Sequence, residues 1–232
     1  MRVILLAAGL GTRLRPLTDQ LPKCLVSIGG RPLLEIWLEQ LTDSGFGPFL
    51  VNTHYLKDQV YDFVKSSRFR SQVELVEEPV LLGTAGTLRA NLDFFQESDG
   101  MLVHADNYCR ADFGRFQRVH QCRAHGCMMT MMTFRTHSPS SCGVVEVDSR
   151  GVVTGFYEKV KNPPTMIANG AVYILSRELL ADFPSVSDMS TEVLPRYVGE
   201  IQTYHTEETF IDIGTPEAYE RACQSVVREE LG

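Results

Sequence analysis

The feature that most constrains this chain is its first 25 residues, where a short apolar run leads into a glycine-containing loop. The run from Val3 to Ala8 is too short to span a membrane and stops at Gly9, which is typical of a buried strand. Because Gly9 and Gly11 lack a Cβ, the backbone there can approach a ligand with its N–H groups directed at phosphate oxygens. The stretch predicts an α/β fold whose first strand ends at an anion-binding loop.

Charge supports a bound anion at this loop. The segment carries Arg2, Arg13, Arg15 and Lys23 against Asp19, whereas the whole chain has a net charge of −7. An arginine can bind two phosphate oxygens at once, and a lysine supplies a movable point charge. The net negative charge argues against nucleic acid and against an anionic membrane as partners. The glycine spacing alone also fits an ordinary turn after a strand, since it matches neither a Walker loop nor a dinucleotide fingerprint.

Length and composition favour one folded domain over residues 1–232. A chain of 232 residues with 44% hydrophobic content can bury a full core. No apolar run approaches the ~20 residues of a membrane span, and no signal-peptide pattern is seen, so the expected location is the cytoplasm. The six cysteines form no CxxC pair, which indicates reduced thiols.

The order of elements predicts a Rossmann-like, doubly wound α/β sheet with helices on both faces. Helical and strand patterns alternate as helix 32–44, strand 49–54, helix 57–66 and strand 73–77, which is typical of parallel strands. Later strands with short connections add an antiparallel portion, so the predicted sheet is mixed and mostly parallel. These later strands are expected at 101–107, 128–134, 143–148, 152–159 and 168–175.

Beyond these patterns, the complete N-terminal string resembles the signature of the sugar-1-phosphate nucleotidylyltransferases, in particular short members similar to mannose-1-phosphate guanylyltransferases. That signature reads G-x-G-T-R, P-L-T and P-K after a strand, and all three parts are present. They are Gly9 with Gly11-Thr12-Arg13, then Pro16-Leu17-Thr18, then Pro22-Lys23. The resemblance implies nucleotide binding at Ala8, Gly9, Gly11, Thr12 and Arg13.

A second motif, EEPVLLGTAG at 77–86, resembles the base-binding loop of the same family. It implies nucleotide contacts from Glu78, Gly83, Thr84 and Gly86, although the pattern alone also fits a turn and a helix start. An ionised carboxylate only accepts hydrogen bonds, and guanine offers two adjacent N–H donors. Glu78 therefore favours GTP over UTP or dTTP.

Two aspartates follow predicted strands and are candidate metal ligands. Each alone also fits a turn or a helix cap. The resemblance implies that Asp106 and Asp212, the latter within the family's D-I-G-T-P, hold Mg²⁺, a hard ion that takes few carboxylates together with phosphate oxygens. The family's usual glycine before the first aspartate is Ala105 here, which changes the local backbone and leaves the carboxylate in place.

Sugar-phosphate contacts are implied at two further motifs. Glu158-Lys159 resembles the family's E-K, although spacing alone fits a solvated surface pair. Asn169-Gly170 resembles the mouth of the family's sugar-side strand. The proline that usually follows E-K is Val160 here, so contacts to the sugar are expected to differ.

These motifs imply an enzyme that transfers a nucleoside monophosphate from an NTP, preferably GTP, to a mannose- or heptose-type sugar 1-phosphate, for nucleotide-sugar and polysaccharide biosynthesis. Arg13, Lys23 and Asp106 are the expected catalytic residues, with Mg²⁺ as cofactor. Open alternatives are uridylyl or thymidylyl transfer, cytidylyl transfer to phosphocholine-like acceptors, and a non-catalytic nucleotide sensor. The sequence leaves a homodimer open.

Overall fold

The computed structural model describes residues 1–231, with side chains described through residue 226. The chain forms two compact units, each made of three segments that alternate along the sequence. The N-terminal unit comprises Val3–Leu81, His104–Ala111 and the segment from Glu208, and the central unit comprises Met1–Arg2, Leu82–Val103 and Asp112–Glu207.

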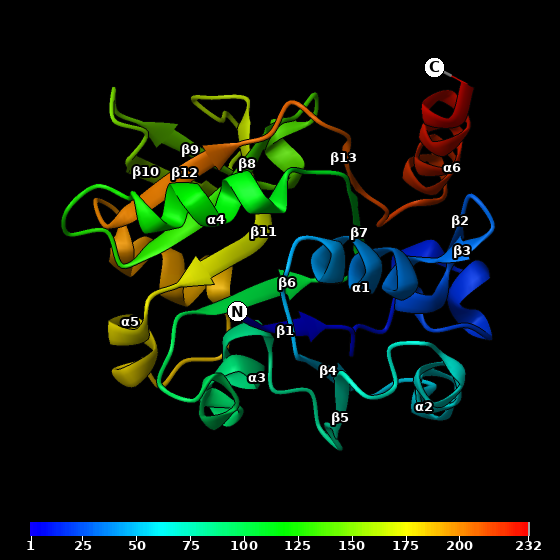
Figure 1. Ribbon diagram of the computed structural model, residues 1–232. Coiled ribbons are helices and arrows are strands. Elements are labelled where there is room, and N and C mark those ends of the chain that lie inside the picture. The colour runs from blue at the N-terminus through cyan, green and yellow to red at the C-terminus, as the bar shows by residue number, and fades with distance from the viewer. Residues whose placement is uncertain (232) are drawn as a thin grey trace. The chain divides into compact units, whose positions relative to one another are not determined.

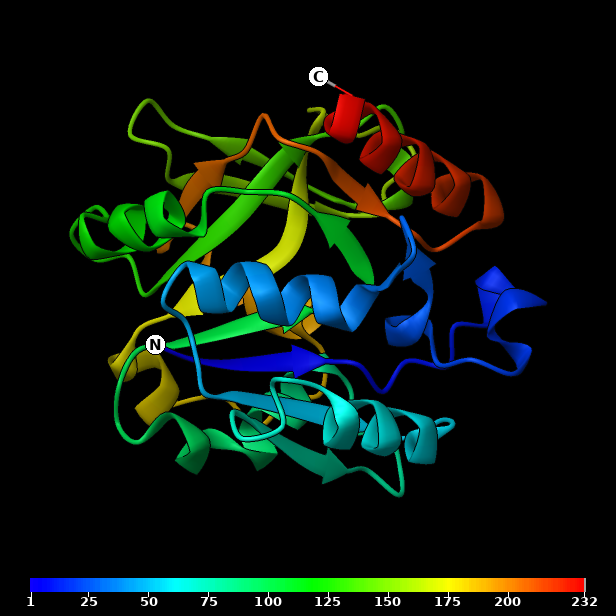
Figure 2. The ribbon, with the colours of Figure 1, turned by 45° about the vertical axis from the view of Figure 1, so that its right-hand side comes forward.

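Three parallel strands joined by helices form the core of the N-terminal unit (Figures 1 and 2). Strand β4 pairs with β1 on one side and with β5 on the other, and the chain passes between them through α1 and α2. Their bounds are β1 (Arg2–Leu6), α1 (Leu33–Asp43), β4 (Phe49–Thr53), α2 (Lys57–Ser66) and β5 (Val73–Glu77).

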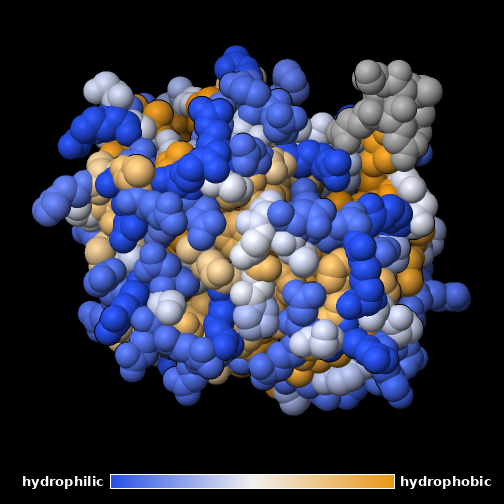
Figure 3. All heavy atoms as spheres, in the orientation of Figure 1, coloured by the Kyte–Doolittle hydropathy of each residue, from blue (hydrophilic) through white to orange (hydrophobic). Residues whose placement is uncertain are grey.

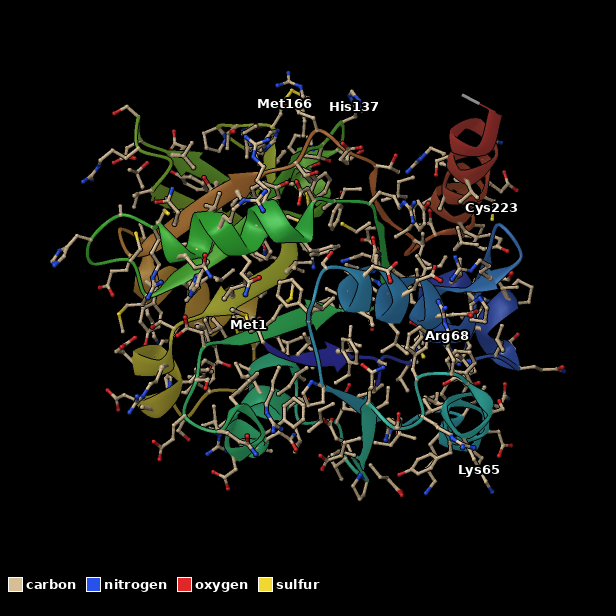
Figure 4. All side chains as sticks on the ribbon, in the orientation of Figure 1. Met1, Lys65, Arg68, His137, Met166 and Cys223 are labelled. Atoms are coloured by element: carbon tan, nitrogen blue, oxygen red, sulfur yellow. The ribbon has the colours of Figure 1, made fainter. Side chains whose placement is uncertain are left out.

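Helix α1 is held by both packing and hydrogen bonds. Its apolar side chains recur at helical spacing and are fully buried, and Trp37 Nε1 donates to Asn107 O at 2.8 Å. Arg68, labelled in Figure 4, forms an ion pair with Glu39 of α1 from the turn after α2. The buried set on α1 is Leu33, Leu34, Trp37, Leu38 and Leu41.

Short elements complete the N-terminal unit. Three 3₁₀ turns follow β1, a small hairpin precedes α1, and strand β7 pairs antiparallel with β13 ahead of the final helix α6. Their bounds are η1 (Thr12–Leu14), η2 (Leu17–Asp19), η3 (Lys23–Leu25), β2 (Ser27–Ile28), β3 (Arg31–Pro32), β7 (Asn107–Cys109), β13 (Phe210–Asp212) and α6 (Pro216–Leu231).

The central unit is built on strand β11, which pairs antiparallel with β6, β8 and β9. Strand β10 forms a hairpin with β9, and β12 runs parallel to β8. The bounds are β6 (Gly100–His104), β8 (Met129–Arg135), β9 (Gly143–Val147), β10 (Val153–Glu158), β11 (Ile167–Leu175) and β12 (Ile201–His205).

Helix α4 packs on β8 and β12 of the central unit with its apolar side. Asp112 caps it by accepting a hydrogen bond from Arg115 N at 2.7 Å, and Phe113 and Phe116 are buried. The helical segments of this unit are α3 (Thr84–Ala90), η4 (Leu92–Phe95), α4 (Phe113–Gln121), η5 (Pro139–Ser141), α5 (Arg177–Ala181), η6 (Met189–Val193) and η7 (Leu194–Tyr197).

The predicted α/β class with a mixed sheet is confirmed, and one element boundary differs from expectation. The strand expected at 101–107 ends at His104, because Ala105 and Asp106 form a turn before β7 begins. Helix α4 ends at Gln121, and Arg123 in the turn that follows donates to the carbonyl oxygens of His120 and Cys127.

In the part of the chain that the structure describes, no helix is both long and apolar enough to span a membrane. Figure 3 shows hydrophilic residues over much of the face in view, with apolar residues between them.

Candidate active site

The glycine-containing loop after β1 is shaped by contacts within the N-terminal unit. Gly11 has φ +63°, and a Cβ there would lie 3.0 Å from Thr18 Cγ2, so both the backbone angle and the space require glycine. Thr18 Oγ1 donates to Gly11 O at 2.7 Å. The next residues, Thr12 and Arg13, form an exposed 3₁₀ turn, while Ala8 is 5% exposed and Gly9 has open space around it.

Arg13 lies against the backbone of the D-I-G-T-P motif. A Cβ built on Gly214 would be 2.8 Å from Arg13 Nη2 and 3.0 Å from Cζ. Real Cβ atoms essentially never approach so closely, so the guanidinium can occupy this place only because residue 214 is glycine. Two motifs that lie far apart in the sequence therefore meet at the guanidinium.

Lys23 joins the two candidate metal ligands. Its side chain is 6% exposed, and its Nζ lies 2.8 Å from Asp106 Oδ2 and 3.8 Å from Asp212 Oδ1. The two carboxylates are 41% and 55% exposed, so they remain open to solvent while the lysine is buried. The structure therefore brings three of the candidate site residues together, Lys23, Asp106 and Asp212.

The pairing of β7 with β13 positions the carboxylate of Asp212. In the β7–β13 ladder Asp212 is the partner of Asn107, which directly follows Asp106. A shift of one residue in this register would turn Asp212 to the other face of the ladder. The Trp37 indole fixes the same strand by its bond to Asn107 O.

The electrostatics of Asp106 favour its charged form. The protein shields part of this half-exposed carboxyl from water, which raises its pKa, but the Lys23 ammonium and its hydrogen bond, together with His104, outweigh that effect and hold the pKa below its usual value. The side chain is thus an ionised oxygen ligand at neutral pH.

The donor set fits a hard divalent cation. Two carboxylates that approach one lysine provide oxygen ligands, and Mg²⁺ is commonly held by one or two carboxylates together with substrate phosphates. Among the described residues no group of three or more His, Cys, Asp or Glu side chains is placed to hold a metal.

Glu78 lies at the end of β5 with its carboxylate held in place. It is 3% exposed, and its Oε1 accepts a hydrogen bond from Asn52 Nδ2 at 3.0 Å. Asn52 Oδ1 in turn accepts from Ala7 N at 2.7 Å. A hydrogen-bonded chain therefore runs from the residue just after β1, through β4, to Glu78.

In the central unit, the G-T-A-G segment packs closely on residues 187–189. A Cβ on Gly83 would lie 2.3 Å from Ser187 O, and the N–H groups of Ala85 and Gly86 donate to the same carbonyl at 2.9 and 3.2 Å. Thr84 Oγ1 accepts from Met189 N at 2.8 Å. The small residues of this motif are explained in part by that packing.

The Glu158-Lys159 pair ends β10 in the central unit. Lys159 Nζ is 3.3 Å from Glu158 Oε1, and Lys159 has a left-handed backbone with φ +49°. A Cβ on Gly143 of the neighbouring strand would lie 2.5 Å from Glu158 Oε2. Gly143 therefore makes the space that this carboxylate occupies.

Asn169 and Gly170 lie at an irregularity of β11. Asn169 Oδ1 accepts from Ala171 N at 2.9 Å, and its Nδ2 donates to Tyr173 OH at 2.8 Å. Ala171 has φ +54°, and the pairing register with β8 shifts between Asn169 and Tyr173. The Asn169 side chain thus stabilises a bulge in the strand.

Sequence reasoning missed four residues that shape these sites. Thr18 belongs to the P-L-T motif and Asn52 to the strand expected at 49–54, and neither is among the predicted site residues. An amide within a buried strand is a signal that could have identified Asn52, because such a group needs partners. Gly143 carries no local signal, and Gly214 is marked only as part of the D-I-G-T-P motif, because the importance of both depends on side chains that approach from elsewhere.

With this geometry established, comparison with known proteins places the chain in a family. The model of the family described as Nucleotidyl transferase matches residues 2–229. The chain belongs to the nucleotidyl transferase family. Enzymes of this family are generally metal-dependent.

Relatives named for sugar-phosphate activation are similar over nearly the whole chain. A mannose-1-phosphate guanylyltransferase of Mycobacterium tuberculosis is 29% identical over 97% of this chain. A UTP–glucose-1-phosphate uridylyltransferase of Synechocystis is 27% identical over 100% of it. The chain spans 64% of the length of each of these relatives.

Among solved structures, HddC from Yersinia pseudotuberculosis complexed with GMP-PN is 29% identical, with a TM-score of 0.81. The match covers 97% of this chain and 99% of HddC. A Bacillus anthracis structure named as a glucose-1-phosphate thymidylyltransferase superposes with a TM-score of 0.85 at 19% identity, which supports the fold alone.

Proposed function

We propose that this protein transfers a nucleoside monophosphate from an NTP to a sugar 1-phosphate, giving a nucleoside-diphosphate sugar and pyrophosphate. The observation that carries the proposal is the contact of buried Lys23 with Asp106 and Asp212 in the unit that holds the G-T-R loop. The matching family model and the names of the relatives support the same reaction class.

The reaction needs no protein nucleophile. An oxygen of the sugar phosphate attacks the α-phosphorus, a new P–O bond forms, and the bond between the α-phosphorus and the bridging oxygen breaks as pyrophosphate leaves. Catalysis is then positioning and charge neutralisation. Arg13 holds the leaving pyrophosphate, and Lys23 stabilises the negative charge that builds on the α-phosphate.

Mg²⁺ is the proposed metal, held by Asp106 and Asp212. When bound, it neutralises phosphate charge and reduces the repulsion between two anionic substrates. The two carboxylates keep oxygen ligands available next to Lys23, whose ammonium balances their charge before substrates bind.

The proposed nucleotide is GTP. Ala8, Gly9, Gly11 and Thr12 contribute to phosphate and nucleoside binding, and Glu78 accepts hydrogen bonds from the pairing edge of guanine. The guanylyltransferase name of the mycobacterial relative and the GMP-PN complex of HddC support this choice. Gly83, Thr84 and Gly86 are the further proposed contacts of the base.

The proposed acceptor is a mannose- or heptose-type sugar 1-phosphate. Lys159 contacts its phosphate, while Glu158, Asn169 and Gly170 contact the sugar. The uridylyltransferase relative from Synechocystis makes uridylyl transfer the second candidate. We further propose that residues 1–232 act as a single catalytic domain in the cytoplasm, where NTPs are made.

The test is pyrophosphate release with each of five NTPs and Mg²⁺ against a panel of sugar 1-phosphates, with phosphocholine included. We expect a signal with GTP and one sugar 1-phosphate. Lys23→Ala and Asp106→Asn should each lower kcat about 10²-fold, as loss of a preorganised electrostatic contact does. Arg70→Ala, which changes an exposed cation elsewhere, is the matched control.

Near-normal kcat in the folded Lys23→Ala variant would remove Lys23 from the mechanism. Pyrophosphate release with UTP and with no other NTP would favour uridylyl transfer, the second candidate. If the unmodified protein binds nucleotide in a thermal-shift assay but releases no pyrophosphate across the panel, a sensor role replaces the proposal.

A further inference from the structure

Asn52 is a polar residue in a buried strand. All five residues of β4 are buried, and Asn52 is 3% exposed. Burial of an amide is costly unless its polar atoms have partners. Here they bridge two strand ends, because Oδ1 accepts from Ala7 N at 2.7 Å and Nδ2 donates to Glu78 Oε1 at 3.0 Å.

The orientation of this amide follows from the chemistry of its partners. A backbone N–H can only donate, so the Asn52 atom that faces Ala7 must be the carbonyl oxygen. The other end of the amide is then the NH₂ group, which obliges Glu78 Oε1 to act as an acceptor. The Asn52 side chain cannot reverse without losing both bonds.

The main chain of Glu78 is fixed as well. Its N–H donates to Thr53 O at 2.8 Å, and its carbonyl oxygen lies 2.7 Å from His54 Nδ1. Backbone and side chain are therefore both held by residues 52–54 of the neighbouring strand and its end. A carboxylate held in this way presents a fixed array of acceptor oxygens.

We infer that Asn52 is a positioning residue that sets the nucleobase preference by fixing the Glu78 carboxylate. The inference rests on the proposed function, in which Glu78 accepts from the N–H donors of guanine. Uracil and thymine have one N–H between two carbonyls, and those carbonyls would face acceptor oxygens. A site built for particular hydrogen bonds rejects analogues that leave its polar groups unpaired.

Asn52→Asp tests this most directly. It keeps the size of the side chain and an acceptor for Ala7 N, but replaces the donor that faces Glu78 with an oxygen. We expect kcat/KM for GTP to fall about 10-fold or more, consistent with loss of a buried bond to a charged group. The values for UTP and dTTP should change less than about 3-fold, so the preference for GTP over each should narrow.

Thr53→Val is the matched control. Thr53 is the next residue of β4, is 1% exposed, and bonds Val76 O through its hydroxyl at 3.3 Å. The change removes a buried hydrogen bond between β4 and β5 and keeps the hydrogen bond between Asn52 and Glu78. We expect the ratio of kcat/KM between GTP and UTP to stay at the wild-type value.

A second variant that keeps Glu78 maintains the test if Asn52→Asp alone does not fold. Asn52→Leu has a side chain of similar size, brings no second carboxylate next to Glu78 and removes the donor that holds Glu78 Oε1. The GTP preference should narrow as in Asn52→Asp. Wild-type preference in the folded Asn52→Leu variant would overturn the inference.

The remaining outcomes distinguish failure of the proposed role of Asn52 from failure of the proposed function. If Asn52→Asp lowers kcat/KM by the same factor for GTP, UTP and dTTP, Asn52 supports the fold and does not select the base. If the unmodified enzyme uses UTP or dTTP in place of GTP, this inference fails while the reaction class stands. If it uses no NTP, the proposed function fails first.

Discussion

Gly214→Ala tests whether the guanidinium of Arg13 must lie where the structure has it. Gly214 does not have a positive φ, so alanine fits the backbone. The added Cβ would meet Arg13 Nη2 at 2.8 Å and Nη1 at 3.0 Å. Because these atoms end a flexible side chain, the guanidinium would move and the fold would remain.

The size of the displacement gives the size of the effect. Ordinary contact begins near 3.4 Å, so Nη2 must retreat from 2.8 Å by about 0.6 Å. A misplacement of about 1 Å in a positioning group can cost about 10²-fold in rate, so we expect kcat/KM to fall about 10- to 100-fold. The melting temperature should not fall, since Gly→Ala at a permissive angle stabilises by about 0.4–1 kcal/mol through the unfolded chain.

The assay is pyrophosphate release, followed together with thermal unfolding. Gly114→Ala in α4 is the control, because its Cβ would be 3.3 Å from the nearest atom and its φ is also not positive. Arg13→Ala and the double variant with Gly214→Ala complete a cycle. If Gly214 acts through Arg13, the double variant should be no slower than Arg13→Ala.

Two results would refute this reasoning. Normal kcat/KM in Gly214→Ala, with Arg13→Ala impaired, would mean that the guanidinium works equally well when displaced. If the fold-loss of kcat/KM in the double variant equals the product of the two single-variant losses, Gly214 acts through something other than Arg13.

Two further predictions concern stability. His120 Nε2 lies 3.3 Å from Asp99 Oδ2, and this interaction lowers the pKa of Asp99 below its usual 3.8. Asp99→Asn should therefore reduce the free energy of unfolding above pH ~4, and the difference from wild type should disappear as the pH falls through the folded pKa. Urea titrations at several pH values would measure this difference, and a difference that grows on acidification would contradict the prediction. Trp37→Phe leaves the carbonyl of Asn107 without its indole donor and should cost about 1–3 kcal/mol, seen as a lower urea midpoint at unchanged slope, and an unchanged midpoint would contradict it.

Elements with strong local periodicity could be predicted from the sequence. The spacing of apolar residues around Trp37 predicts α1, and the apolar run from Phe49 predicts β4. Both predictions are possible because the pattern of buried side chains lies within a short stretch of sequence. The turn at Ala105 and Asp106 could not be separated from the apolar strand before it. That turn depends on β7 finding β13, a partner about 100 positions later in the chain.

In the candidate site, too, local motifs could be predicted from the sequence and long-range contacts could not. Lys23, Asp106 and Asp212 are candidates from the sequence because their motifs are contiguous strings, and the structure places the Lys23 ammonium near both acids. Their arrangement, and the supporting roles of Asn52 and Gly214, arise from distant residues. The separate nucleotide and sugar contacts inferred from the motifs stay predictions.

The pairing of β7 with β13 also decides when the site can form during synthesis. Asp106 leaves the ribosome early, but Asp212 must be made and must find Asn107 in register before the second carboxylate is in place. At about 5–20 residues per second, the intervening stretch takes on the order of 5–20 s to translate. Until then the growing chain has Lys23 and only one of the two carboxylates that contact it, so the candidate site is completed only when β13 has been made.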